Sequence, residues 1–465
     1  MTFSTWRLTT LVAVLWLGGC QRGPDAPDVA GEASKLTGIA DAIHFESQLP
    51  TNAPEAPPDV LTLTEASRLA VLRDAQIQAA LAKVRAAQAT ARQARLLPNP
   101  LLNFVARFQE GGGDPIIEVA LAEDLLAVLR RPYSIKASDA SLRAAAADAL
   151  ASVLDVLGAV QSSYANLQAI EEELQILRRR KQVVDQLLQL TEGKQKAGEA
   201  SRADVSMVQT QKVELDVEME DLQSQAADER LTLTRLIGQP SGAAEWNIAP
   251  WQPPPDLGGA EQAWMSAAMQ NRPELRAKEW ELAALGAQRR GEKWAPLQGS
   301  DIGAHAERDV TWSVGPAVTV PLPIFDTGRA ALDKLTAQEI GARHELTQRQ
   351  RQVIEEVRRA YAGYKSALST LRLADNQLLP LAQQRYEQAQ SAYKAGETDL
   401  LRLLAAEEDL QDARKKLVDL HKRASLARIK LYRAAGGPGV IPTASSAPQT
   451  QPATRPSTRP HQDTP

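Results

Sequence analysis

Side chains that commonly carry chemistry are sparse in this sequence, and their spacing does not form a site. The chain has one cysteine, Cys20, and none of its five histidines has metal-ligand spacing: His44, His305, His344, His421 and His461. Adjacent carboxylates are typical of solvated helix faces rather than of acid and base partners, as at Glu171-Glu172 and Glu407-Glu408. No glycine-rich phosphate loop, nucleophile motif or catalytic triad occurs. The residues therefore predict a protein that is not an enzyme, with no cofactor and no metal site.

Cys20 is the one residue whose position predicts a modification. Arg7 precedes a short apolar run, Leu8 to Leu17, and a small-residue cleavage region follows at Leu17-Gly18-Gly19-Cys20. These four residues resemble a bacterial lipobox, which implies that 1–19 is a lipoprotein signal peptide and that Cys20 is acylated as the first mature residue. Each buried CH₂ of its chains would add about 0.8 kcal/mol to membrane attachment. The alternative is an ordinary signal or buried N-terminal segment with a free cysteine.

Charge and composition narrow the class of protein further. The formal net charge is −4, with Lys and Arg interleaved among Asp and Glu, so no basic face indicates a nucleic-acid partner. Aromatic residues make up only 4% of the chain, and alanine is abundant. This composition favours long helices in close contact over a thick globular core.

A repeated motif shows that the chain is a tandem duplication. Lys-Ala-Gly-Glu occurs at Lys196 to Glu199 and again at Lys394 to Glu397, an offset of 198 residues. The same offset relates Ile77 to Leu275, Pro98 to Pro296, Arg131 to Arg329 and Gly238 to Gly436, and Tyr164 pairs with Tyr361 one residue out. A register held this long predicts two repeats, at 61–240 and 259–438.

The remaining segments are predicted to connect or flank the repeats. Residues 241–258 form a Pro-rich crossover linker, because Pro253-Pro254-Pro255 cannot continue a helix. Residues 20–60 are a lipid-anchored N-terminal tether, and 439–465 are a disordered C-terminal tail rich in Pro, Ser, Thr and Gln.

The first repeat predicts two short helices, a hairpin and a long helix. A helix is expected from Leu63 to Leu96, where Pro98 stops it, and alternation then predicts strands over 101–108 and 117–122. After Pro132 a long helix is expected as far as Gly198, with a seam of Leu167, Ile170, Leu174, Leu177, Val184 and Leu188. Gly198 ends it, and Ser201 with Asp204 predicts the N-cap of a returning helix that reaches Ile237.

The second repeat predicts the same plan. A helix is expected over 261–295, strands over 301–307 and 312–320, and a long helix from Arg329 to Ala395 that is kinked near Pro380. The returning helix covers 398–435. At 1.5 Å per residue each long helix spans roughly 100 Å, and two short helices stacked end to end would match it.

Four strands per chain cannot close a barrel, and their apolar faces need an apolar environment. Open sheet edges are not tolerated in lipid, so several protomers are expected to pool their strands. Three protomers would supply twelve, which lies within the range of outer-membrane barrels.

At this point the sequence resembles the TolC-type outer-membrane efflux proteins, and the lipobox resembles their lipoprotein branch, which serves RND-type drug or heavy-metal exporters. The resemblance covers 61–438 and is carried by the duplicated plan, the glycines at both tips and the run Val320-Pro321-Leu322-Pro323-Ile324-Phe325-Asp326-Thr327-Gly328-Arg329. It implies a homotrimer with a twelve-stranded transmembrane barrel continued by a twelve-helix periplasmic barrel. Such proteins are passive exit ducts in the outer membrane that dock on a periplasmic adaptor and an inner-membrane pump.

The resemblance also implies which residues act. Adaptor contacts are expected at the two helical tips, Lys196, Ala197, Gly198, Glu199, Lys394, Ala395, Gly396 and Glu397. In the family pattern an aromatic residue three before the second tip glycine latches onto an acid six after the first, which here are Tyr393 and Asp204. The acidic ring that often narrows the pore is absent, because Arg402 and Ala405 occupy its places. The alternatives are purely structural: both glycines only cap helices, Tyr393 packs in the helix seam, and Asp204 only caps the returning helix.

Two other classes of protein compete with this interpretation. A lipid-anchored periplasmic adaptor would have one helical hairpin between β-rich halves, whereas this sequence predicts two hairpins with short strands inside each repeat. A structural coiled-coil lipoprotein is disfavoured by the alternating strand pairs. The sequence does not name the exported substrate, the pump or the adaptor.

Overall fold

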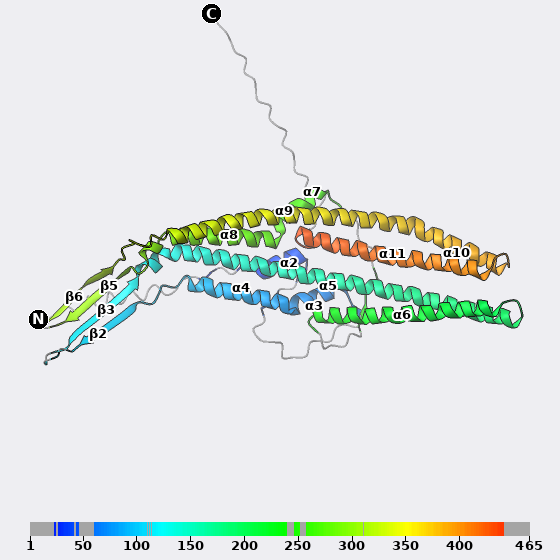
Figure 1. Cartoon of the computed structure of the whole chain (residues 1–465), viewed down its shortest axis with the longest axis horizontal. Coiled ribbons are helices and arrows are strands. Elements are labelled where there is room, and N and C mark those ends of the chain that lie inside the picture. The colour runs from blue at the N-terminus through cyan, green and yellow to red at the C-terminus, as the bar shows by residue number, and fades with distance from the viewer. Residues whose placement is uncertain are drawn as a thin grey trace, which may run out of the picture.

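The computed structural model describes residues 23–24, 27–40, 43–45, 60–108, 110, 112, 114–239, 246–251, 257–309 and 311–440. The predicted signal peptide 1–19 and Cys20 lie outside the described residues, as do parts of the tether, the linker and the tail. The described chain is a long rod with a β-sheet at one end and two helical turns at the other (Figure 1).

Each repeat folds in the same order of elements, so the predicted mainly α, duplicated helix-strand-strand-helix fold is confirmed. The first repeat contains α3 (Leu63–Arg73), α4 (Ala75–Gln93), β2 (Leu101–Arg107), β3 (Ile116–Asp124), α5 (Leu125–Lys196) and α6 (Arg202–Leu236). The second contains α7 (Glu261–Asn271), α8 (Pro273–Glu292), a 3-10 turn (Ala295–Leu297), β5 (Asp301–Arg308), β6 (Trp312–Thr319), α9 (Arg329–Leu373), a π-helical turn (Ala374–Leu378), α10 (Leu379–Lys394) and α11 (Leu400–Ala435).

Three predicted helix boundaries were wrong. The first helix of each repeat is broken, at Asp74 and at Arg272, where the backbone is extended. The Asp74 side chain accepts hydrogen bonds from the backbone N–H groups of Gln76 and Ile77, which restarts a helix as α4. Arg272 precedes Pro273, and proline disfavours the helical conformation of the residue before it. The long helix α5 begins at Leu125 rather than at Pro132, because Asp124 caps it through the N–H of Ala127.

These breaks decide how the short helices stack. Gly238 follows α6 with φ +77°, and a Cβ there would lie 2.6 Å from the Cβ of Arg73. Gly436 follows α11 with φ +104°, and a Cβ there would lie 3.1 Å from the carbonyl carbon of Asn271. Both returning helices therefore end against the breaks, and glycine permits the close approach. The stacking predicted from helix lengths thus pairs α4 with α6 and α8 with α11.

The four long strands form one antiparallel sheet in the order β2-β3-β5-β6. Central pairing joins the repeats, for example Val119 opposite Ala306. The outer sides of the edge strands β2 and β6 are unpaired among the described residues. Large apolar side chains stay exposed on the sheet within one protomer: Leu101, Leu102, Phe104, Leu121, Ile302, Trp312, Val314 and Val318. The sheet therefore has apolar surface and two open edges to cover.

The helix α5 is the centre of the protomer. It packs against α4 and α8 near the sheet, and against α6 and α11 toward the far end. The predicted seam is confirmed, since Leu167, Leu174, Leu177 and Val184 are all buried. One stretch of α5 is apolar enough to cross a membrane by length and composition, but more than half of it is buried in the protomer, as in a core helix.

A further helix lies in the predicted tether. The helix α2 (Val29–Thr37) buries Ala33 and Leu36, and the N–H of Gly439 donates a 2.9 Å hydrogen bond to the carbonyl of Leu36. A short parallel pair joins tether to linker, with β1 (Val60–Leu61) beside β4 (Asn247–Ile248). The two ends of the described fold thus meet near the middle of the rod.

Tyrosines hold the start of each repeat in the same way. The hydroxyl of Tyr164 donates to the carbonyl of Leu61 at 2.9 Å and accepts from the N–H of Ala249 at 3.1 Å. In the second repeat the hydroxyl of Tyr361 donates to the carbonyl of Gly259 at 3.2 Å. Leu61 and Gly259 are 198 residues apart, so the pairing of Tyr164 with Tyr361 has the same structural role in both repeats.

Candidate functional site

The predicted tip residues form two exposed turns at the end of the rod opposite the sheet (Figure 1). Gly198 has φ +79° and Gly396 has φ +76°. In the first turn the N–H of Glu199 donates to the carbonyl of Lys194 at 2.8 Å, and in the second the N–H of Glu397 donates to that of Ala392 at 2.9 Å. This is the Schellman pattern of hydrogen bonding, in which glycine adopts the left-handed conformation after a helix. Both glycines therefore cap helices, and all eight predicted tip residues are accessible.

The residues that follow the two turns differ. After the first, Ser201 and Asp204 form a reciprocal capping box, in which the N–H of Asp204 donates to Ser201 Oγ at 3.1 Å and the N–H of Ser201 donates to Asp204 Oδ2 at 2.8 Å. These hydrogen bonds from Ser201 lower the pKa of the Asp204 carboxyl. After the second turn Asp399 caps alone, accepting from the N–H of Arg402 at 3.0 Å. The first turn is therefore the more firmly fixed of the two.

The predicted gate residues have separate partners within one protomer. Lys194 places its ammonium 4.5 Å from the centre of the Tyr393 ring and donates a 3.4 Å hydrogen bond to its hydroxyl. Asp204 is engaged by Ser201, and no hydrogen bond joins it to Tyr393 among the described residues. The Arg402 side chain is exposed. The contact between Lys194 and Tyr393 ties the first tip to the second, while the predicted latch stays a prediction.

An apolar groove runs between the two hairpins just above the tips. Its volume is about 340 Å³, and residues from α5, α10 and α11 line it. One end of the groove holds Lys194, Lys394 and Tyr393, and the other holds Tyr386 and Glu407. The sequence did not predict this groove, because it exists only where the two hairpins lie side by side.

The prediction that Glu407 lies on a solvated helix face was wrong. Its exposed fraction is only 4%, whereas its neighbour Glu408 is exposed. Arg180 Nε lies 3.3 Å from Glu407 Oε2, but neither carboxylate oxygen has a well-aligned hydrogen bond. Burial raises the pKa of the Glu407 carboxyl, and Arg180 and Gln411 act in the opposite direction. Neither Arg180 nor Gln411 was a sequence candidate, since single Arg and Gln side chains in a helix pattern usually lie at the surface.

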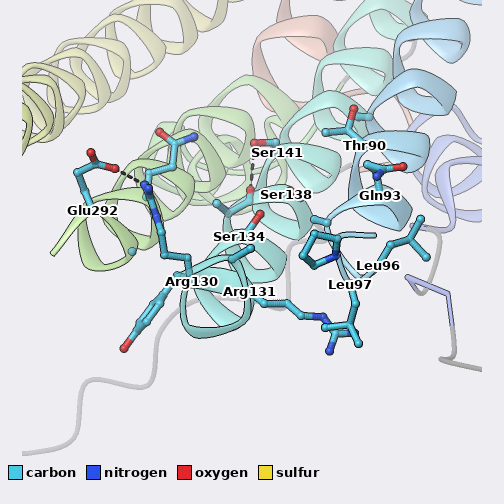
Figure 2. A pocket seen from close by; sticks show the side chains of 18 of the residues that line it. Thr90, Gln93, Leu96, Leu97, Arg130, Arg131, Ser134, Ser138, Ser141 and Glu292 are labelled. Atoms are coloured by element: carbon cyan, nitrogen blue, oxygen red, sulfur yellow. Dashed lines mark hydrogen bonds and ion pairs between the residues drawn. The ribbon is translucent and has the colours of Figure 1, made fainter. Parts of the chain in front are cut away.

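Three larger cavities lie along the same helix, with volumes of about 840, 780 and 660 Å³. Figure 2 shows the one nearest the sheet, where Ser134, Ser138 and Ser141 of α5 lie between the ion pair of Arg130 with Glu292 and the side chains of Leu96 and Leu97.

Among the residues of α5 that line the four cavities, eight are separated by multiples of seven positions, and this set is termed the cavity face of α5: Ala127, Ser134, Ser141, Asp155, Ser162, Ala169, Val183 and Leu190. A seven-residue period keeps one face of a packed helix in one direction. The linker contacts different positions, since Gln168 Nε2 donates to the carbonyl of Ala249 at 2.9 Å. The cavity face is polar from Ser134 to Ser162 and apolar at Val183 and Leu190.

No group of His, Cys, Asp and Glu among the described residues is arranged to hold a metal ion. The only predicted modification residue, Cys20, lies outside the described residues. The described residues form exposed turns, a groove and a row of cavities.

Comparison with known proteins identifies a family model and curated relatives with similar sequences. A family model described as outer membrane efflux protein matches residues 66–239 and 264–437. The pyoverdine export outer membrane protein OpmQ of Pseudomonas aeruginosa is 26% identical over 275 residues, which cover 54% of this chain and 55% of that protein. Nodulation protein T of Rhizobium leguminosarum bv. trifolii is 28% identical over 279 residues, which cover 56% of this chain and 58% of that protein. The alignments thus span little more than half the length of these curated relatives.

The fold is similar to that of a solved structure. The outer membrane protein VceC of Vibrio cholerae superposes with a TM-score of 0.67 and 20% sequence identity, covering 81% of this chain and 96% of that one. At this level of identity the likeness concerns the fold.

Proposed function

Since this chain belongs to the outer membrane efflux protein family, whose model matches both of its repeats, we propose that it is the outer-membrane exit duct of a tripartite efflux system. In this proposal it is a passive conduit rather than an enzyme, and it conducts substrates from an inner-membrane pump through a periplasmic adaptor. It lies in the outer membrane and extends into the periplasm.

One observation carries the proposal: the same rod has an apolar, open-edged sheet at one end and polar, exposed turns at the other. Leu102 is 71% exposed, Phe104 64% and Val314 76%, which is costly in water but favourable in a lipid bilayer. A helical wall joins this sheet to tips that carry Lys196, Glu199, Lys394 and Glu397. Such a molecule suits a membrane at the sheet and a partner protein at the tips.

A homotrimer is proposed because the protomer has two unpaired edges, both in its sheet and in its layer of helices. Toward the tips the helices lie in the order α6, α5, α11, α10, so α6 and α10 are the outer ones. Both carry exposed apolar side chains, Val213 and Val217 on α6 and Leu381 on α10. Pairing α6 of one protomer with α10 of the next would bury them, just as pairing β2 with β6 would close the sheet.

Heights along the helices support this pairing. Val217 lies 15 residues beyond the start of α6 at Arg202, or about 22 Å from the tip, and Leu381 lies 13 residues before the end of α10 at Lys394, or about 20 Å. Leu231, which is also exposed, lies 29 residues along α6, or about 44 Å. Val217 and Leu381 therefore lie at nearly the same distance from the tip, whereas Leu231 and Leu381 do not.

Cysteine crosslinking tests the assembly. With Val217→Cys and Leu381→Cys together, mild oxidation should give a covalent trimer from outer-membrane fractions, because the thiols would face each other across the interface. The control pair Leu231→Cys and Leu381→Cys should stay monomeric on denaturing gels. Equal crosslinking of both pairs, or none with either, contradicts the proposed trimer.

Conductance tests the duct itself. In planar bilayers the protein should form channels, and Tyr393→Phe or Asp204→Ala should enlarge the single-channel conductance if these residues latch the tips together across protomers. Unchanged openings in both variants would remove the latch while leaving the duct. A protein that forms no channel would contradict the proposed function.

Two finer parts of the proposal concern attachment and partners. Acylation at Cys20 is proposed from the lipobox, and radiolabelled palmitate should be incorporated by the native protein but not by Cys20→Ser. The tips are proposed as adaptor contacts, and an RND-type pump is the proposed source of substrate. The domain boundaries proposed are those of the sequence analysis, with repeats at 61–240 and 259–438.

A further inference from the structure

The groove between the hairpins has the size and lining of a small-molecule site. Its volume of about 340 Å³ lies at the lower end of the range for ligand pockets. Apolar side chains of α5 and α11 contribute much of its lining: Val183, Leu187, Leu190, Leu403 and Leu404. Leu190 is 48% exposed and Val183 37%, so apolar surface remains uncovered inside the groove.

A buried acid gives the groove one specific polar contact. Glu407 lines the groove, is 4% exposed, and has two carboxylate oxygens without a well-aligned hydrogen bond. Its nearest cation, Arg180, lies 3.3 Å away through Nε, which is also without a well-aligned hydrogen bond. Buried polar groups are normally satisfied, so this carboxylate is suited to accept hydrogen bonds from a bound donor.

One aromatic ring of the groove, that of Tyr393, already holds a cation. The Lys194 ammonium lies 4.5 Å from the centre of the Tyr393 ring, and Tyr386 lies at the end of the groove near Glu407. Rings of this type attract cations through their faces. Lys194 and Lys394 occupy the tip end, so a further positive charge is disfavoured there. Glu407, the acid that lines the groove, lies at the other end with Arg180 and Arg414 near its carboxyl.

The groove shares one face of α5 with the other cavities. Val183 and Leu190 belong to the cavity face of α5, together with the polar residues that line the three cavities above them. In the proposed duct this shared face is the inner wall. On that point alone the inference rests on the proposed function.

We propose that this groove is a binding site for hydrophobic organic cations, with the cationic group on the Glu407 carboxylate and the apolar body along Val183, Leu187 and Leu190. An ammonium or amidinium N–H would donate well-aligned hydrogen bonds to Glu407, in competition with the Arg180 guanidinium. The bound molecule would touch α5 of the first hairpin and both α10 and α11 of the second. It would therefore hold the two hairpins together and favour a closed tip.

Binding of ethidium, an aromatic cation, to the purified full-length protein tests the site by fluorescence anisotropy, with detergent alone as background. Glu407→Gln should weaken the Kd about tenfold or more, because a hydrogen bond to a charged group is lost while the shape is kept. Glu408→Gln, one residue away and exposed, should leave the Kd unchanged. Lys394→Gln should leave it unchanged or lower it, since a repelling charge is removed.

A second variant keeps the test independent of folding at the buried acid. Leu190→Gln changes an exposed wall residue and should also weaken ethidium binding, while trimer migration before heating stays native. An anionic aromatic probe, 8-anilinonaphthalene-1-sulfonate, should bind no more tightly to the native protein than to Glu407→Gln.

Equal ethidium affinity in Glu407→Gln and Glu408→Gln would overturn the proposal, as would equal dependence of the anionic probe on Glu407. Conductance separates this outcome from failure of the duct. Native channels should close more often when ethidium is added, and Glu407→Gln channels should conduct but not respond. A protein that binds ethidium through Glu407 but forms no channel would retain the site and contradict the duct.

Discussion

The two long helices of this protein come from one duplicated plan and differ in continuity. In the first repeat α5 is a single helix of 72 residues, whereas the second repeat uses α9 of 45 residues, a π turn of 5 and α10 of 16. Burial differs as well. Many side chains of α5 are buried in the protomer, but in α10 only Ala382 is. After duplication, the long helix of the first repeat became the packed centre of the protomer. The long helix of the second repeat became an edge helix, in which the π turn separates α10 from α9.

The tips repeat this contrast on a smaller scale. Both turns keep the same glycine hydrogen bonding, but only the first has the reciprocal box of Ser201 and Asp204. The two repeats share the backbone turn, and they differ in the side-chain hydrogen bonds that fix it. The second hairpin is thus the one that can move with less loss of packing.

The largest effect is expected from deleting both Asp375 and Asn376 in the π turn. The π turn absorbs one extra residue, so the first deletion alone would restore a regular helix, and the second would rotate α10 by about 100° relative to α9, since each residue turns an α-helix by that angle. Ala382 and Tyr386 would leave their positions against α11. We expect the local free energy of unfolding of α10 and α11 to fall by about 3 kcal/mol or more, measured by amide hydrogen exchange.

The matched control is Pro380→Ala, which keeps the number of residues and should change exchange in α10 far less. The first hairpin should be unaffected in both variants. Equal loss of protection in α5–α6 and α10–α11 would mean that the two hairpins form one cooperative unit, and the comparison would fail.

A smaller effect is expected from the paired tyrosines. Tyr164→Phe should lower the free energy of unfolding by about 1–3 kcal/mol, because the fully buried hydroxyl serves both Leu61 and Ala249. Tyr361→Phe should cost about 0.5–1.5 kcal/mol, because its hydroxyl is partly buried and serves Gly259. Denaturant unfolding of the two variants under one condition measures the difference. A larger loss in Tyr361→Phe would reverse the order of the repeats.

The smallest effect concerns acid sensitivity of the first tip. The pKa of the Asp204 carboxyl is lowered by hydrogen bonds from Ser201, so its contribution to the cap is present above its unfolded pKa and is lost as pH falls through the lower folded value. Amide exchange near Ser201 should therefore accelerate in acid beyond its intrinsic pH dependence.

Replacing Asp204 with Asn should abolish this dependence at the first tip and leave the second tip unchanged. If the native protein and Asp204→Asn respond alike to acid, Asp204 does not fix the first tip, and the asymmetry between the tips has another origin.

Local signals predicted most of the fold. The seven-residue seam in α5, the glycines at both tips and the alternation of the strands each specify structure within a few neighbouring residues, and all were found in place. The breaks at Asp74 and Arg272 were missed although Pro273 and the capping character of Asp74 were visible. Because good helix formers lie on both sides of each break, the pattern predicted one continuous helix. A single extended residue is nevertheless enough to end one helix and start the next.

The groove could not be predicted in the same way. Val183, Tyr386 and Glu407 are far apart in sequence and meet only because α5 packs against α11. Glu407 was interpreted as a solvated residue because it adjoins Glu408, yet one step along a helix turns a side chain from the surface into the interior. Its burial depends on the partner helix, and the sequence of its own helix does not contain that information.

The seam between α2 and the chain after α11 has a mechanical consequence. The N–H of Gly439 binds the carbonyl of Leu36, and Gly437 packs closely on the same carbonyl, so the two ends of the described fold lie side by side near the middle of the rod. Tension applied between those ends would load this short seam first, peeling its contacts one after another. The sheet and the tips, each far along the rod, would bear none of that force until the seam had opened.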